Sequence, residues 1–597
     1  MTKRLARTEV PREQTWDIQS LYPTLEAWEA DLAVVESMLP AMQAHQGRLG
    51  EGAAALLACL RQMDELNERA GRLIWFAYNC ASVDQANPEA QGLRDRGIAM
   101  MAKVSAATSF IRPEILALPC GTIEGYLSQD HDLGMYRLFL TDILSVKEHM
   151  LGAEAESALA QFGELAEAPY IIWQNTTAAD MKFDPVRDEQ GNEVPMSVAA
   201  YLRLAQSPDR SVRQNAFESL TRGYLAHKRT ITATMATAQK RDVILARLRR
   251  YPSALSAALS EVFLPEELFY NMLRVAEEGA HHLRRYNRFR RQELGVDTLQ
   301  PWDLAAPLDA DVDSEISFAD AQGMILAALA PLGPEYRAVL EQAFAERWID
   351  WGDNEGKEAG AYSWGLYGFH PIIMLTWSGK IADVFTLAHE LGHAVHSVLS
   401  ARAQPFIYSD YTDFLAEMAS TTNELLLARH LLANTTDRTL RRYVLTRALG
   451  AFGANFWGAS MMAALQLEMH QMVERDEPLT YESITARSVD IYKRWNGDTM
   501  EVLPEAAGSQ WLRVLHHFRN FYSYQYATGI SAAAAFADAI LTEGEPAVKR
   551  YLGFLSAGSS AHSIDILKTA GVDMTTPAPM EKAVAYFGEL VTALENA

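Results

Sequence analysis

The residues best suited to chemistry lie in the stretch FTLAHELGHAVHSVL, which runs from Phe385 to Leu399. The stretch contains no proline, and its apolar residues recur at helical spacing, so we expect a single α-helix. On that helix His389 and His393 are one turn apart and about 40° apart in azimuth, so both imidazoles face one point. Two imidazoles placed in this way can bind a tetrahedral zinc ion. The spacing therefore predicts a metal site.

Glu390 adds a possible base to this pair. It lies about 100° round the helix from His389, so its carboxylate can reach a water molecule on the metal without binding the metal itself. A Lewis acid, an activated water and a carboxylate base together are suited to hydrolysis. The rest of the helix surface is apolar, which draws the histidines into an interior where ring nitrogens without partners would be costly. This favours a metal site over histidines that merely pack.

A third metal ligand must come from elsewhere in the chain. The metzincin pattern would place a glycine and a third histidine where this chain has His396 and Leu399, so that variant is excluded. His396 lies about 10 Å along the axis from His389, so we expect it to pack beside the site or to support a ligand.

The obvious donor is a carboxylate on a second helix. The stretch DFLAEMASTTNELLLARHLL, residues 413–432, is strongly helical and presents Glu417 and Glu424. These residues are seven apart, so they share a face about 10 Å apart along the axis. One can bind the metal while the other orients a ligand histidine. The spacing leaves both assignments open.

The motif LAHELGHAVHS followed by AEMASTTNE resembles the M3 peptidase family, most closely its oligoendopeptidase F branch. Supporting stretches occur in the right order over nearly the whole chain, including TWDIQSLYPTLEAWEADL, KRDVILARLRRYPSAL, GKEAGAYSWG and HHFRNFYSYQYATGISAA. The resemblance implies one zinc ion per chain, held by His389, His393 and Glu417. It implies that Glu390 is the base and that Glu424 orients a ligand.

The stretch HHFRNFYSYQY near the C-terminus is rich in histidine and tyrosine. By composition alone it would be an aromatic helix face packed in a core. The family resemblance implies instead that His516 stabilises the transition state, with His517 as the alternative. It also makes Tyr524 and Tyr522 the hydroxyl donors. Phe518 stands where relatives carry a tyrosine, so one hydroxyl is missing at that position.

The composition excludes several partner classes. The chain has 597 residues, with 53 basic against 76 acidic side chains and a formal net charge of −23. This balance argues against nucleic acid or an anionic membrane as a partner, because both require basic surface. The three cysteines are sparse and unclustered, which indicates a reducing compartment. The N-terminus shows no signal-peptide pattern, so we expect a cytoplasmic protein.

The sequence predicts a mainly helical chain with an N-terminal helical lobe over residues 1–200 and a catalytic domain over residues 201–597. Residues 181–197 are predicted to form a β-hairpin. Residues 360–377 are predicted to form short strands of a small sheet beside the HExxH helix. Residues 448–467 carry no charge over a membrane-spanning length, but their glycine and polar content favours a helix buried in the protein.

The resemblance implies a two-lobed, neurolysin-like M3 fold that encloses a deep channel, which only short, unfolded peptides could enter. We therefore expect a zinc-dependent endopeptidase acting on oligopeptides, although manganese or cobalt could substitute for zinc. One alternative is a carboxypeptidase or dipeptidyl carboxypeptidase, for which no cationic anchor can be assigned. The other is a non-catalytic peptide-binding protein with a structural zinc. The oligomeric state does not follow from the sequence.

Overall fold

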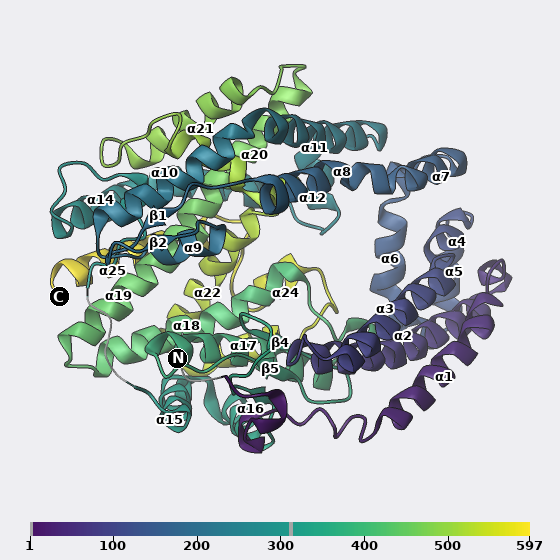
Figure 1. The fold of residues 1–597 in the computed structure, drawn as a ribbon. Coiled ribbons are helices and arrows are strands. Elements are labelled where there is room, and N and C mark those ends of the chain that lie inside the picture. The colour runs from purple at the N-terminus through teal and green to yellow at the C-terminus, as the bar shows by residue number, and fades with distance from the viewer. Residues whose placement is uncertain (1–3, 310–314) are drawn as a thin grey trace. The chain divides into compact units, whose positions relative to one another are not determined.

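The computed structural model describes residues 4–309 and 315–597, and most of them are helical (Figure 1). The contacts divide the chain into two compact units, each assembled from three segments. Unit 1 comprises Met1–Glu148, Ser314–Leu427 and Ala537–Gly571, and unit 2 comprises His149–Asp313, Ala428–Phe536 and Val572–Ala597. The predicted domain division at residue 200 stays a prediction.

Unit 1 contains the HExxH helix and a three-stranded sheet. Its helices are α1 (Leu25–Gln43), α2 (Ala53–Ser82), α3 (Pro88–Thr108), α4 (Ile111–Ala117), α5 (Thr122–Gln129), α6 (Arg137–Ser145), α15 (Phe318–Ala328), α16 (Gly333–Ala345), α17 (Ile381–Ala403), most of α18 (Asp413–Asn434), α23 (Glu545–Leu555) and α24 (Ser563–Thr569). Its strands are β3 (Ile349–Asp350), β4 (Tyr362–Trp364) and β5 (Ile372–Met374).

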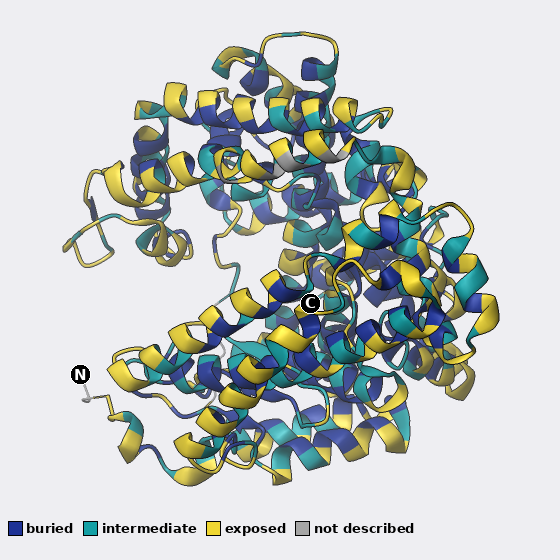
Figure 2. Ribbon diagram, turned by 90° about the vertical axis from the view of Figure 1, so that its right-hand side faces the viewer, coloured by how far each residue is buried: buried dark blue, intermediate teal, exposed yellow. Residues whose placement is uncertain are grey.

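Unit 2 contains the histidine and tyrosine segment. Its helices are α7 (Ala153–Gln161), α8 (Gly163–Asn175), α9 (Val198–Leu204), α10 (Arg210–Ala226), α11 (Lys228–Leu248), α12 (Ala254–Ser260), α13 (Glu266–Glu278), α14 (Ala280–Glu293), α19 (Arg438–Phe452), α20 (Ala459–Glu474), α21 (Tyr481–Asn496), most of α22 (Tyr524–Glu543) and α25 (Ala578–Glu595). The strands β1 (Val186–Arg187) and β2 (Glu193–Val194) pair antiparallel, which confirms the predicted hairpin. Figure 2 shows helices with buried residues on one side and exposed residues on the other, as amphipathic packing requires.

Helix α17 carries the HExxH motif, and local signals set both of its ends. At the start, the Asp383 carboxylate accepts hydrogen bonds from the backbone N–H groups of Ser378 (2.8 Å) and Lys380 (3.1 Å). An acidic side chain in the first turn also favours the positive end of the helix dipole. The helix ends at Ala403, two residues before Pro405, which disfavours helical continuation.

The sheet in unit 1 has the strand order β3-β5-β4, with β3 parallel and β4 antiparallel to β5. Ser363 pairs with Ile373, so β4 forms one edge of the sheet. The β5 side chains are fully buried, and both β4 and β5 pack against α17. The predicted small sheet beside the HExxH helix is therefore confirmed.

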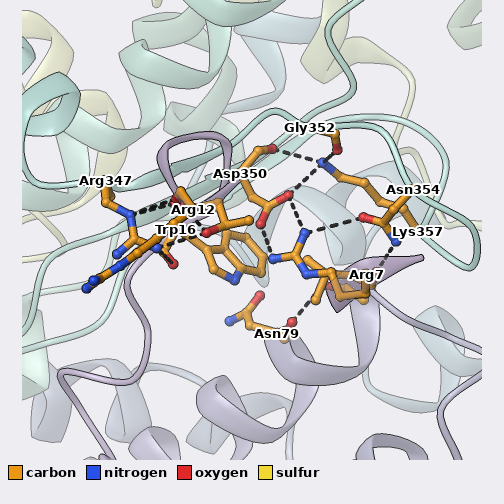
Figure 3. A network of polar contacts seen from close by, with 12 residues as sticks. Arg7, Arg12, Trp16, Asn79, Arg347, Asp350, Gly352, Asn354 and Lys357 are labelled. Carbon is orange, nitrogen blue, oxygen red and sulfur yellow. Dashed lines mark hydrogen bonds and ion pairs between the residues drawn. The ribbon is translucent and has the colours of Figure 1, made fainter. Parts of the chain in front are cut away.

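A buried ionic network fixes this sheet (Figure 3). Lys357 donates hydrogen bonds to the Asp350 carboxylate and to the carbonyls of Gly352 and Leu375, each at 2.7 Å. Arg7 pairs with the same carboxylate from the N-terminal segment. Charges buried in this way are tolerated because each has a partner. The network ties the ends of β3 and β5 to the start of the chain.

The uncharged stretch 448–467 forms the end of α19, a π-helical turn at Gly453–Gly458 and the start of α20. Its large apolar side chains are buried, among them Phe452, Phe456 and Trp457. The prediction of a helix packed inside the protein is confirmed. Over the described residues, no helix is long and apolar enough to cross a membrane.

Candidate metal centre

The three predicted metal ligands converge in unit 1. Glu417 on α18 places Oε2 3.3 Å from Nε2 of His389 and 3.7 Å from Nε2 of His393, both on α17. The three potential ligand atoms all lie within 4.8 Å of one another. In a tetrahedral zinc site with bonds of about 2.0–2.2 Å, the ligand atoms lie roughly 3.4 Å apart. This donor set therefore fits a single divalent metal ion.

A glycine inside the motif allows α17 and α18 to approach so closely. A Cβ atom built on Gly392 would lie 2.6 Å from Cα of Ser420 and 2.9 Å from the carbonyl oxygen of Ala419. The side chain of Asn423 ties the two helices further by donating to the carbonyl of Ala388 at 2.9 Å. Glycine normally weakens a helix interior, so its presence here is explained by the contact. That contact brings Glu417 to both histidines.

Glu424 lies behind His389 rather than in the ligand cluster. Its Oε1 is 2.8 Å from Nδ1 of His389, so Nδ1–H donates to the carboxylate and Nε2 is left to face Glu417. Ser420 supports the other carboxylate by donating to Oε2 of Glu417 at 3.1 Å. This geometry supports the assignment in which Glu417 is the ligand and Glu424 orients a histidine.

The charges around the two histidines favour a bound cation. Burial lowers the pKa of His389, but the carboxylates of Glu417 and Glu424 outweigh it and raise the pKa to about 10. Burial lowers the pKa of His393 to about 4, so its imidazole is neutral. Burial alone would raise the pKa of Glu417. The hydrogen bond from His389 and the nearby histidines have the larger effect and lower that pKa to about 2. A divalent cation would replace the proton on His389, since a metal ligand must be the neutral imidazole.

Glu390 has the environment of a general base. Its residue is only 5% exposed, and burial raises the pKa of its carboxyl group to about 7. Its Oε2 is buried and has no hydrogen-bond partner in the described part of the chain. A carboxylate with a pKa near neutrality can both accept and return a proton.

His396 is fully buried and packs face to face on Tyr411, with ring centroids 3.6 Å apart and an interplanar angle of 3°. Within residues 4–309 and 315–597, neither of its ring nitrogens has a hydrogen-bond partner. The ring therefore projects from the ligand helix α17, three residues along the chain from His393, onto Tyr411. A supporting role for His396 stays a prediction.

In unit 2 the structure brings His516 together with two tyrosines. Nε2 of His516 lies 3.1 Å from the hydroxyl of Tyr526, and its ring stacks with Tyr522 at 5.8 Å between centroids. The rings of Tyr522 and Tyr526 meet edge to face at 5.7 Å. His516 is half-buried. Burial lowers the pKa of its imidazole, and the positive charge of Arg519 lowers it further. Two hydroxyl groups and one imidazole thus form a cluster of potential donors.

The remaining predicted residues of this segment lie in the core of unit 2. Tyr524 is 2% exposed, its ring packs edge-on to Phe269, and burial raises its pKa. His517 and Phe518 are also buried. The roles predicted for Tyr524 and His517 stay predictions. The sequence interpretation did not single out Tyr526, although its spacing of four residues from Tyr522 was an available signal.

Comparison with known proteins identifies the family. The model of peptidase family M3 matches residues 203–586, and a model described as Oligopeptidase F matches residues 114–183. The chain belongs to peptidase family M3. Oligopeptidase PepF from Bacillus subtilis is 36% identical over 590 residues, covering 99% of this chain and 88% of that protein. An oligoendopeptidase F homolog from Lactococcus lactis is 30% identical, covering 99% and 98%.

Solved structures agree with this membership. A putative peptidase from Chlamydophila abortus superposes with a TM-score of 0.93 at 29% identity and covers 100% of both chains. Oligoendopeptidase-F from Enterococcus faecium gives a TM-score of 0.74 at 30% identity and covers 96% of this chain and 98% of that one. The predictions of a mainly α M3 peptidase fold and of a metalloendopeptidase are confirmed.

Proposed function

We propose that this M3 peptidase is a zinc-dependent endopeptidase that hydrolyses short, unfolded oligopeptides. The observation that carries the proposal is the convergence of His389, His393 and Glu417, beside a Glu390 oxygen on α17 that has no hydrogen-bond partner among the described residues. Cysteine ligands, which often close structural zinc sites, are absent from the described cluster. A catalytic site therefore explains the residues better than a structural one.

The chemistry divides among a few groups. A zinc ion held by the three ligands would acidify a water molecule and polarise the scissile carbonyl. Glu390 accepts the proton of the attacking water and returns it to the leaving amine, as base and then as acid. Negative charge develops on the carbonyl oxygen, and donors aimed at that atom stabilise it. We assign this task to His516 with Tyr522, and the 3.1 Å contact between His516 Nε2 and the Tyr526 hydroxyl adds Tyr526.

The edge of the small sheet suits an extended peptide. Strand β4 pairs with β5 on one side only, so its other side can take a substrate backbone by β-augmentation. Helix α2 fixes this strand, because the Trp75 indole donates to the carbonyl of Trp364 at 3.1 Å and the Tyr362 hydroxyl donates to Asn79 at 2.7 Å. An edge held in this way suits unfolded peptides, because an extended segment has its backbone N–H and C=O groups free to pair with it.

The decisive experiment compares wild type with Glu390→Gln. Each protein is assayed for zinc content and for cleavage of an internally quenched peptide of about ten residues, since general-base loss costs roughly 10²–10⁴ in rate. We expect one zinc per chain in both proteins and internal cleavage by wild type alone. Equal cleavage by the variant, or a wild type that holds zinc and cuts nothing, would contradict the proposal.

A second assay separates internal from terminal cleavage. Peptides with free and amidated C-termini should be cut at the same internal bonds and at similar rates, because no anchor for a terminal carboxylate is assigned. A strong requirement for the free C-terminus would point to a carboxypeptidase or dipeptidyl carboxypeptidase with the same ligands. The cytoplasmic location stays a prediction.

A further inference from the structure

The segment that carries His516 has little regular structure of its own. It consists of a single 3-10 helix, Leu515–Phe518, and a turn that leads into α22. Its internal backbone bonds are few and partly long, such as the 3.4 Å contact from the N–H of Tyr522 to the carbonyl of Arg519. Backbone carbonyls buried in such a segment need partners from outside it.

Two helices of unit 2 supply those partners to three consecutive carbonyls. From α11, Gln239 donates its amide N–H to the carbonyl of His517 at 2.7 Å, and Arg241 reaches the carbonyl of Phe518 at 3.4 Å. From α20, Gln466 donates to the carbonyl of Arg519 at 3.0 Å. Because a carbonyl only accepts, each glutamine must present its NH₂ group to the segment.

The turn itself is held in a conformation that its sequence does not favour. Phe521 has a φ of 50°, in the left-handed region that a bulky L-residue adopts only when its surroundings impose it. His470 from α20 stacks on the Phe521 ring at 4.5 Å, and Phe269 meets its edge at 5.6 Å. The ring nitrogens of His470 lie 2.9 Å from the carbonyl of Gln466 and 3.4 Å from Asp242. The turn is thus fixed by packing on both sides.

We propose that Gln239 and Gln466 are positioning residues for His516, holding its segment in the conformation that brings the imidazole beside Tyr522 and Tyr526. Both glutamines are fully buried, and each donates its amide to a backbone carbonyl of the segment. Their amides act on the backbone on the C-terminal side of His516, so their loss would let the imidazole drift while the zinc ligands in unit 1 stay unchanged. The inference rests on the proposed role of His516 in stabilising the oxyanion.

The test uses Gln239→Met and Gln466→Met, which keep the side-chain volume and remove the donor. The expected result is a fall in kcat of about tenfold with KM changed by less than about twofold, because a group that acts only in the transition state changes kcat and kcat/KM together. Zinc content should equal that of wild type. Gln214→Met is the matched control, since the amide of that glutamine donates to Glu218 of its own helix, and the change should leave kcat unchanged.

A double-mutant cycle distinguishes positioning from general structural damage. In the His516→Gln background, each methionine variant should lower the residual kcat by less than about twofold, because the group it positions is gone. An equal loss in both backgrounds, or no loss in wild type, would overturn the inference while leaving the peptidase proposal intact. If His516→Gln retains the wild-type kcat, the role of His516 fails and the inference fails with it. Should one methionine variant not fold, the other decides, because the two glutamines come from different helices.

Discussion

The proposed metal ligands and the proposed oxyanion donors are held in place by different means. His389 and His393 lie one turn apart on a long helix, and Glu417 meets them from a second helix packed closely against it. His516 and Tyr522 lie in a short irregular segment. Side chains of distant helices bind that segment through its carbonyls.

The two regions should therefore differ in which substitutions disturb them. In the helical region the ligand geometry follows from regular backbone spacing, so damage must come from the ligands or from the contact between the helices. In the irregular segment the geometry depends on hydrogen bonds to residues far away in the sequence. Four comparisons test this contrast.

The largest expected effect separates metal binding from oxyanion stabilisation. Glu417→Ala should lose the bound metal and lower kcat/KM by at least about 10³, because the Lewis acid is gone. His516→Gln should keep the metal and lower kcat by about 10²–10³, as for other oxyanion donors. Metal analysis with peptide kinetics measures both, and Asp413→Asn, exposed on the first turn of α18, is the control. Full metal content in Glu417→Ala would show that the third ligand is another group.

Gly392→Ala tests the close approach of α17 and α18. The added methyl group would meet Ser420 Cα at 2.6 Å, a backbone atom that cannot move without shifting its helix. We expect a loss of about 1–3 kcal/mol in the free energy of unfolding. Displacement of Glu417 should also lower kcat/KM by about a hundredfold.

The control for this change is Gly71→Ala in α2, where, among the described residues, no side chain and no backbone atom of another element lies within 4 Å of the new methyl group. There the substitution should be neutral or stabilise the protein by up to about 1 kcal/mol, since alanine is the better helix former. Chemical denaturation of both variants measures the two changes in the free energy of unfolding. Equal stability of the two variants would show that the close packing of α17 and α18 does not require glycine at position 392.

Glu424→Gln tests the carboxylate that orients His389. The amide can still accept the Nδ1–H bond seen at 2.8 Å, but it no longer carries the negative charge. We expect metal affinity to fall by about 10–100-fold with the fold intact. Competition with a chromogenic chelator gives the affinity, and Glu341→Gln, whose side chain is paired with Arg337, is the control. An unchanged affinity would leave Glu424 without a role at the metal.

The smallest expected effect compares two tyrosines of the C-terminal segment. Tyr526→Phe should lower kcat by about tenfold, less than a full oxyanion donor, because His516 and Tyr522 remain. Tyr524→Phe should change kcat by less than about threefold, since that ring is buried beside Phe269. Steady-state kinetics on one peptide ranks the two. A larger loss of kcat in Tyr524→Phe than in Tyr526→Phe would show that Tyr524, and not Tyr526, is the donor.

Much of the fold was predictable because its signals are local. Helical periodicity predicted the helices around His389 and Glu417, and turn residues predicted the hairpin at Val186–Val194. Tyr526 was not singled out, because composition cannot tell which face of an aromatic segment turns into the core. The importance of Gly392 was also not predictable, because the sequence does not show which atoms of a neighbouring helix would lie near a Cβ atom at that position.

The HExxH spacing alone predicts the histidine pair and the carboxylate next to it, because residues one turn apart on a helix face the same point wherever that helix packs. The packing of the helices, rather than any spacing in the sequence, places Glu417 and not Glu424 against both histidine Nε2 atoms. It also decided how the His516 segment is held, since Gln239 and the carbonyl it binds are 278 residues apart. Contacts at such separation depend on how the helices pack, and no local spacing encodes them.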